Sequence, residues 1–247
     1  MRHRMRSAEY KQDAPRVIIP ETQSSPPAYT ENPLWSPKYV FEVTAREQEP
    51  MCLLDTTLSF TYGTSATDRT PRHDTVREMM GTLVAELEGN DSQAAHEEDG
   101  GGLRTVTFAG GRAIDIGDLN TRNLNEVWSQ IKWEGGTYVM PGWNLLKRTY
   151  FDEFGSRRPE DMPALMAIVI TDGEASDLKE FETALATDTN SFVVVVVMGF
   201  GNEHANVMRS FNDVSAANSR VKVIDFGGGV DPANVAGVLK RMVQPKC

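Results

Sequence analysis

The spacing of apolar positions predicts strands that alternate with helices from residue 47 onward. Short apolar or alternating runs predict strands at 51–54, 103–108, 112–116, 165–170, 192–198 and 221–226. Apolar residues at helical spacing predict helices at 74–87, 119–131, 143–154, 177–186, 205–217 and 233–242. The runs 165–170 and 192–198 are nearly continuously apolar, which favours central strands that are covered on both faces.

This alternation predicts an α/β fold, with a doubly wound, mostly parallel open sheet. A Gly110-Gly111 turn between two predicted strands indicates one antiparallel hairpin at the edge of that sheet. Residues 1–46 differ, because they contain six of the chain's 13 prolines and little apolar patterning. We therefore predict a disordered, Pro-rich tail over 1–46 and one domain over 47–247.

The chain is acidic, with a formal net charge of -10 at pH 7. Residues 1–46 hold seven Lys/Arg and five Asp/Glu, so the other 18 Lys/Arg and 30 Asp/Glu give the predicted domain a net charge of -12. Nucleic acids and anionic membranes would be repelled by such a body. The composition therefore argues against both as partners.

Cysteine usage and the start of the chain bear on the compartment. Cys52 and Cys247 are the two cysteines, too few for a disulfide framework. The Arg-rich start leads into no apolar core of the kind that a signal peptide needs. We expect a reducing compartment, the cytoplasm, with the nucleus as the alternative.

Polar residues that follow apolar strands are the candidates for chemistry, since ligands of open α/β sheets bind outside the carboxyl ends of the strands. Asp55 ends the first predicted strand, with Thr57 and Ser59 two and four residues on. Thr137 follows a Gly-Gly pair, and Asp172 follows the 165–170 run. Carboxylates and hydroxyls are hard oxygen ligands, which suit Mg²⁺ or Mn²⁺. An ion with only two anionic ligands can accept a further carboxylate from a partner.

The Asp-x-Thr-x-Ser stretch from Asp55, the Gly-Gly-Thr ending at Thr137 and the Thr-Asp-Gly around Asp172 resemble the metal-ion-dependent adhesion site of von Willebrand factor A domains. The resemblance implies that Asp55 anchors the metal mainly through water, and that Thr57 and Ser59 ligate it through their hydroxyls. It also implies that Thr137 ligates in the ligand-bound state, and that Asp172 completes the site through water.

The resemblance covers about residues 47–243, and the sequences of several segments are similar to those of uncharacterised fungal members of that family. It implies a Rossmann-like fold and a module that binds a protein partner through an acidic residue. Two departures stand in the first loop, where the family usually has Ser in place of Thr57 and commonly Gly in place of Leu58. Leu gives the loop less backbone freedom than Gly would.

Other interpretations remain open at this point. Asp55 or Asp172 alone would be an ordinary turn or helix-cap residue. A Mg²⁺-dependent hydrolase or phosphatase is the alternative function, although no His or Cys stands in these loops as base or nucleophile, and we expect no enzyme. A third possible function is that of a scaffold that binds no metal. Without metal the two carboxylates should repel, so Asp172→Asn should be no less stable than the metal-free domain.

The tail contains a second candidate interaction. Pro26, Pro27 and Tyr29 form a Pro-Pro-Ala-Tyr sequence. WW domains bind such peptides by docking a polyproline helix and its tyrosine in an aromatic groove. A WW-domain protein is therefore a candidate partner of the tail.

Overall fold

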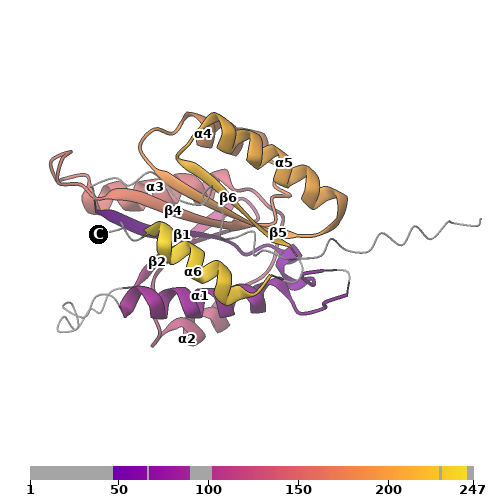
Figure 1. Cartoon of the computed structure of the whole chain (residues 1–247). Helices are drawn as coiled ribbons and strands as arrows, with labels where there is room; N and C mark the ends of the chain where they lie inside the picture. The colour runs from indigo at the N-terminus through magenta and orange to yellow at the C-terminus, as the bar shows by residue number, and fades with distance from the viewer. Residues whose placement is uncertain (1–46, 66, 90–101, 228–229, 244–247) are drawn as a thin grey trace, which may run out of the picture. The chain divides into compact units, whose positions relative to one another are not determined.

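The computed structural model describes residues 47–65, 67–89, 102–227 and 230–243 (Figure 1). The predicted tail 1–46 and its Pro26-Pro27-Ala28-Tyr29 sequence lie outside the described residues. Both therefore stay predictions.

The described residues form strands that alternate with helices (Figure 1). The strands are β1 (Gln48–Asp55), β2 (Leu103–Ala109), β3 (Arg112–Leu119), β4 (Ala164–Thr171), β5 (Phe192–Gly199) and β6 (Val221–Gly227). The α-helices are α1 (Arg72–Glu88), α2 (Leu124–Gln130), α3 (Met140–Phe154), α4 (Leu178–Thr187), α5 (Gly201–Ala217) and α6 (Pro232–Val243), and η3 (Leu58–Thr61) is a 3₁₀ helix.

The strands form one sheet in the order β3-β2-β1-β4-β5-β6. Neighbours are parallel except β2 and β3, which form an antiparallel hairpin at one edge. The turn of that hairpin has positive φ angles of 56° at Gly110 and 73° at Gly111, a backbone region that glycine adopts without steric cost. The predicted mostly parallel α/β sheet with an antiparallel edge hairpin is confirmed.

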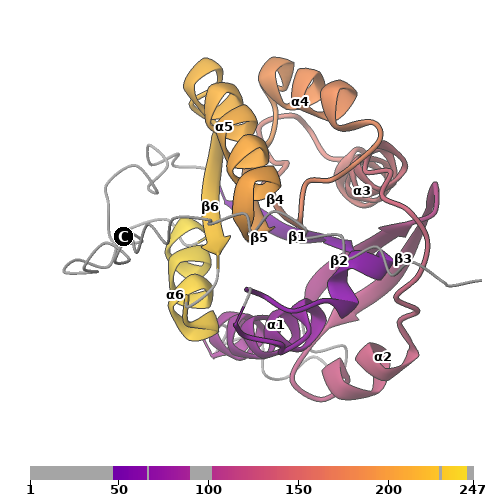
Figure 2. The same ribbon diagram turned by 90° about the vertical axis from the view of Figure 1, so that its right-hand side faces the viewer.

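Helices cover both faces of the sheet: α3, α4 and α5 lie on one side and α1, α2 and α6 on the other (Figure 2). Successive side chains of a strand point to opposite faces of the sheet. Met51 and Leu53 of β1 therefore lie in the core under α3, α4 and α5, and Cys52 and Leu54 lie in the core under α1, α2 and α6. Every residue of β4 and β5 is buried. This two-sided burial explains the continuous apolar runs in the sequence.

The sheet reverses its winding between β1 and β4. These strands are parallel neighbours, with Leu54 opposite Ile170, yet β1 leads to β2 on one side and β4 to β5 on the other. The loops that leave the two strands therefore diverge to opposite faces, and a crevice between such loops is the ordinary ligand site of an open α/β sheet. Asp55 and Asp172 stand at this point.

One predicted helix is wrong in extent. The pattern predicts a helix over 119–131, whereas β3 continues to Leu119 and α2 begins only at Leu124. Asn120 and Asn123 explain the difference, because each side-chain oxygen accepts a hydrogen bond from the other residue's backbone N–H, at 3.0 and 2.9 Å. Such local bonds stabilise a turn in place of a helix.

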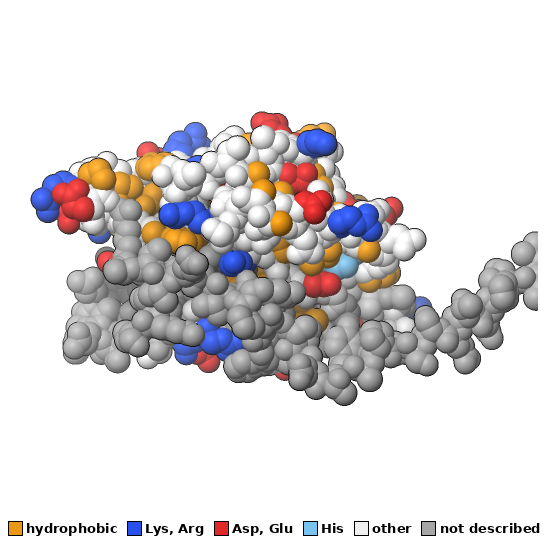
Figure 3. Space-filling view, turned by 45° about the horizontal axis from the view of Figure 1, so that its top comes forward, with side chains coloured by type: hydrophobic (Ala, Val, Ile, Leu, Met, Phe, Trp, Pro, Cys, Tyr) orange, Lys and Arg blue, Asp and Glu red, His pale blue; other side chains and the backbone are white. Residues whose placement is uncertain are grey.

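On the face shown in Figure 3, acidic, basic and hydrophobic side chains are interspersed over the described surface. The acidic excess of the chain is therefore not gathered into one patch in this view. Among the residues that the structure describes, no helix is long and apolar enough to cross a lipid bilayer.

At Gly142, α3 packs closely against the sheet, near the point where the winding reverses between β1 and β4. A Cβ atom there would lie 2.7 Å from Leu53 Cδ1 and 2.9 Å from Phe108 Cβ, which is closer than carbon atoms pack. We expect Gly142→Ala to destabilise the domain by about 1–3 kcal/mol through overpacking. Urea unfolding followed by circular dichroism measures this change.

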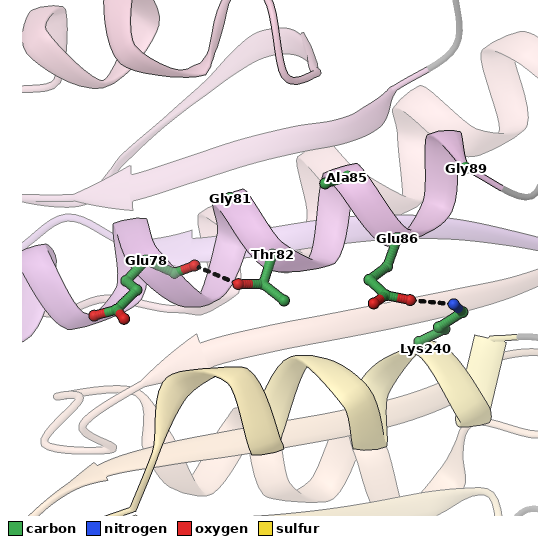
Figure 4. Close-up of a pocket in the computed structure, with 7 residues that line it drawn as sticks. All are labelled: Glu78, Gly81, Thr82, Ala85, Glu86, Gly89 and Lys240. Carbon is green, nitrogen blue, oxygen red and sulfur yellow. Dashed lines mark hydrogen bonds and ion pairs between the residues drawn. The ribbon is translucent and has the colours of Figure 1, made fainter.

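Gly81 on α1 is the matched control, and it lies beside a groove that α1 forms with α6 (Figure 4). A Cβ at Gly81 would meet only Leu124 Cδ2, at 3.4 Å. Gly81→Ala should therefore leave stability unchanged or raise it by up to about 1 kcal/mol, because Ala is the better helix former. Equal effects of the two substitutions would contradict the close packing inferred for α3.

Glu49 gives a prediction for the pH dependence of stability. Burial, followed by the charges of Glu153, Glu47 and Asp118, raises its pKa from 4.5 to about 7, against a lowering by Arg157. The folded state thus holds the proton more tightly than the unfolded state, and stability falls as pH rises from about 4.5 to 7.

Glu49→Gln stays neutral and should raise the melting temperature at pH 8 by more than at pH 4.5. Thermal melts at both pH values measure the gain. The exposed Glu126→Gln is the control and should show no such difference. A gain for Glu49→Gln that does not grow with pH would contradict the assignment.

Candidate metal centre

Asp55 lies at the base of the candidate site, as the last residue of β1 and fully buried. Its Oδ1 accepts the Thr57 backbone N–H at 3.0 Å, and its Oδ2 accepts the Thr171 hydroxyl at 2.9 Å. Burial raises the pKa of this carboxyl well above its usual range, and the charge of Asp172 raises it further, against the lowering by the Thr57 and Thr171 bonds. A cation beside Asp55 would oppose this shift.

Three predicted hydroxyl ligands lie together. Thr57 Oγ1 is 2.9 Å from Ser59 Oγ, and Thr137 Oγ1 donates to Thr57 Oγ1 at 3.3 Å. Thr57 and Thr137 are 80 positions apart in the sequence, and both are buried. The structure therefore brings the hydroxyls of the first and second predicted loops into contact.

Backbone hydrogen bonds hold the loop that carries Thr137. Glu134 N–H donates to Thr56 O at 3.1 Å, and Gly110 N–H donates to Gly136 O at 2.7 Å. Between them Gly135 has a φ of +84°, and a Cβ there would lie 3.1 Å from Gly110 N. Both the left-handed backbone and the close approach favour glycine at 135. The Gly-Gly pair in the sequence thus positions Thr137.

Asp172 follows directly after β4, and both of its carboxylate oxygens are engaged. Oδ1 accepts the Glu174 backbone N–H at 3.2 Å. Oδ2 accepts Arg72 Nη1 at 3.0 Å, in an ion pair whose side chains are 1% exposed for Asp172 and 9% for Arg72. A buried guanidinium therefore shares Asp172 with the predicted metal site.

Sequence reasoning missed Arg72. The helix predicted over 74–87 begins after Arg72, whereas α1 begins at Arg72 in the structure, so the unfavourable position of this cation at a helix N-terminus was not visible in the sequence. Because of this ion pair, Asp172→Asn would do more than relieve the repulsion between Asp55 and Asp172. That substitution would leave a buried guanidinium without its carboxylate, which destabilises a protein.

Leu58, where the resemblance commonly has Gly, fits the first loop without strain. It begins η3 and is 50% exposed. Among the described residues, no residue other than glycine has a positive φ, so the loop does not demand glycine at this position. The departure at Leu58 therefore leaves the arrangement of Thr57 and Ser59 intact.

The donor set suits a hard divalent cation. Carboxylate oxygens of Asp55 and Asp172 and hydroxyl oxygens of Thr57, Ser59 and Thr137 are the ligand types that Mg²⁺ and Mn²⁺ prefer, with water completing the shell. Over the described ranges, no group of three or more His, Cys, Asp or Glu residues could hold a metal ion. Metal binding here would thus depend on the neutral hydroxyls as well as the carboxylates.

Comparison of the sequence with protein-family models and with curated proteins gives no match. Solved structures are similar in fold. The SpRpn10 VWA domain matches with a TM-score of 0.52 at 10% identity, over 77% of this chain and 93% of that one. An aerotolerance-related membrane protein from Bacteroides fragilis matches with a TM-score of 0.52 at 13% identity, over 80% and 98%.

The manganese-loaded TRAP protein of Plasmodium vivax matches with a TM-score of 0.54 at 15% identity, over 83% of this chain and 76% of that one. Identities this low compare folds and not functions. Together with the sheet order and the helices on both faces, they identify the architecture: the chain has the Rossmann-like fold of a von Willebrand factor A domain.

Proposed function

We propose that this domain is a protein-binding module that captures a carboxylate of its partner through a bound divalent cation, Mg²⁺ or Mn²⁺. The ligands are Asp55, Thr57, Ser59, Thr137 and Asp172. The observation that carries the proposal is the convergence of the three hydroxyls, at 2.9 and 3.3 Å, in the loops beside the two buried carboxylates. The manganese-loaded TRAP structure, which shares the fold, supports Mn²⁺ as the probe for testing it.

The balance of charged and neutral ligands favours capture of an acid. Two carboxylates match the charge of a divalent ion but fill few of its about six coordination positions. The hydroxyls add ligands without adding charge, so the ion keeps its attraction for a further anion. A carboxylate from a partner protein is the common anion of this kind at a protein surface.

Exposed apolar side chains at the same edge support a protein as the partner. Leu58 is 50% exposed, Tyr62 59%, Tyr138 44% and Phe200 44%. Leu58 and Tyr62 belong to the loop after β1, Tyr138 follows Thr137, and Phe200 follows β5. Large apolar side chains beside a polar centre are typical of protein interaction surfaces.

The surroundings of the carboxylates favour binding over turnover. Among the described residues, the groups that donate hydrogen bonds to Asp55 and Asp172 are the Thr171 hydroxyl, two backbone N–H groups and the Arg72 guanidinium. None of these is an ordinary general base near neutral pH. We therefore propose a binding module, and the hydrolase alternative enters as an outcome of the experiment below.

Substitutions at two adjacent threonines, Thr57 and Thr56, test the metal part of the proposal. Thr57→Val removes a proposed ligand hydroxyl, so we expect Mn²⁺ affinity to fall by about tenfold or more, whereas Thr57→Ser keeps the hydroxyl and most of the affinity. Isothermal titration calorimetry with Mn²⁺ measures both.

Thr56→Val is the matched control, because Thr56 is not among the proposed ligands and its hydroxyl donates to Phe108 O at 3.2 Å. Its loss should cost about 1 kcal/mol of stability and leave Mn²⁺ affinity unchanged. Absence of Mn²⁺ binding by the wild type, or equal losses for Thr56→Val and Thr57→Val, would contradict the assigned ligands.

The partner part of the proposal is tested by affinity purification with the full chain in Mg²⁺ and in chelator. We expect proteins that are retained by the wild type in Mg²⁺ to be lost in chelator and with Asp55→Asn, since both remove the ion that binds the partner's carboxylate. The exposed Asp213→Ala on α5 is the control and should retain them. Turnover of a generic phosphoester that Asp55→Asn abolishes would instead establish the hydrolase alternative.

A further inference from the structure

Arg72 occupies a position that is unfavourable for a cation. It is the first residue of α1, where the helix dipole opposes positive charge, and its side chain is only 9% exposed. Its Nη1 donates to Asp172 Oδ2, but its buried Nε has no hydrogen-bond partner among the described residues. Burying such a charge is costly unless it is well compensated. The compensation here is a carboxylate that belongs to the proposed metal site.

The charges at the site follow from three buried groups. With Asp55 and Asp172 ionised and Arg72 protonated, the group carries a net charge of -1 without metal and +1 with a divalent cation. Without Arg72 the same group would carry -2 and then zero. Arg72 therefore opposes the entry of the cation, and it also gives the loaded site a surplus positive charge.

Glu174 lies close enough to Asp172 and Arg72 to interact with their charges, and Glu203 interacts with Glu174. Glu174 and Glu203 are both exposed, one in the loop after β4 and the other in the first turn of α5. Water and salt screen exposed charges far more strongly than buried ones. His73, the next residue after Arg72, stacks on Trp133 with ring centroids 4.9 Å apart. The buried Arg72 thus remains the dominant cation beside Asp172.

We propose that Arg72 is an internal counter-ion of the metal site, which competes with the divalent cation for Asp172 and makes an acidic ligand necessary to neutralise the loaded site. Arg72 thus lowers the affinity for metal alone and raises the preference for a carboxylate as the last ligand. This inference rests on the proposed function, since it assigns the chemistry of the ligand at that same site.

The test compares Mn²⁺ binding by the wild type, Arg72→Gln and Arg77→Gln, using isothermal titration calorimetry on the full chain. Arg77 is exposed on the same helix, so its substitution removes an equal charge from a solvated position. We expect Arg72→Gln to bind Mn²⁺ about tenfold more tightly than the wild type, and Arg77→Gln to bind as the wild type does. Equal or weaker binding by Arg72→Gln would overturn the inference.

A second measurement tests the preference for an acid. Acetate at constant ionic strength replaces chloride in the same titrations. Because linkage is reciprocal, acetate that binds to the loaded site should tighten Mn²⁺ binding, and it should do so more for the wild type and Arg77→Gln than for Arg72→Gln. The same response in all three proteins would overturn this half of the inference.

Thermal melts test whether the Arg72 charge stabilises the metal-free site in place of a bound cation. Without metal, Arg72→Gln should melt below the wild type, because Asp172 loses its counter-ion, and Mn²⁺ should raise its melting temperature by more than that of the wild type. If Arg72→Gln does not fold, Asp172→Asn is compared with the double variant Arg72→Gln/Asp172→Asn, which buries no unpaired charge of this pair. Without metal, the double variant should melt above the single one, because it removes the buried guanidinium that has lost its carboxylate, and the opposite order would overturn the counter-ion role.

The results separate this inference from the proposed function. Binding of Mn²⁺ by Arg72→Gln but not by the wild type would support the counter-ion role and defeat the metal-dependent function of the natural chain. Binding by the wild type that Arg72→Gln does not exceed would defeat the counter-ion role and leave the function standing. Absence of binding by both proteins would defeat both.

Discussion

The parallel pairing of β1 with β4 is the constraint on which the candidate site depends. β4 and the second half of β1 are buried between two layers of helices, and Leu54 lies opposite Ile170 in their register. Their carboxyl ends therefore meet at one edge, and the chain leaves them toward opposite sides of the sheet. Polar residues that immediately follow these strands are brought together whatever their separation in the sequence.

This pairing buries two carboxylates close together, and groups from the neighbouring loops and from α1 compensate part of their negative charge. Asp55 and Asp172 are both buried at the end of the pair, and the pKa of Asp55 is raised by burial and by the charge of Asp172. Hydrogen bonds from Thr57, Thr171 and a backbone N–H compensate part of the cost, and Arg72 supplies one positive charge. With both carboxylates ionised, one negative charge remains, and a divalent cation held by the adjacent hydroxyls would more than balance it.

Much of the fold could be predicted from the sequence, because two-sided burial leaves a direct trace in composition. The runs 165–170 and 192–198 correspond to β4 and β5, which are buried at every residue. The Gly110-Gly111 pair marks the turn of the β2-β3 hairpin. The helix predicted over 119–131 was wrong at its start, because side-chain bonds between Asn120 and Asn123 compete with helix formation and leave no trace in apolar periodicity.

For the candidate site, the sequence by itself determined which residues offer candidate oxygen ligands and that they follow strands or a glycine pair. Only the tertiary structure decided that the hydroxyls of Thr57 and Thr137 touch, and that Arg72 pairs with Asp172 across 100 positions. The physical reason is that spacing along the chain reports burial and local conformation. The counter-ion of a buried carboxylate is instead determined by which elements pack beside it, and here that element is the N-terminus of α1.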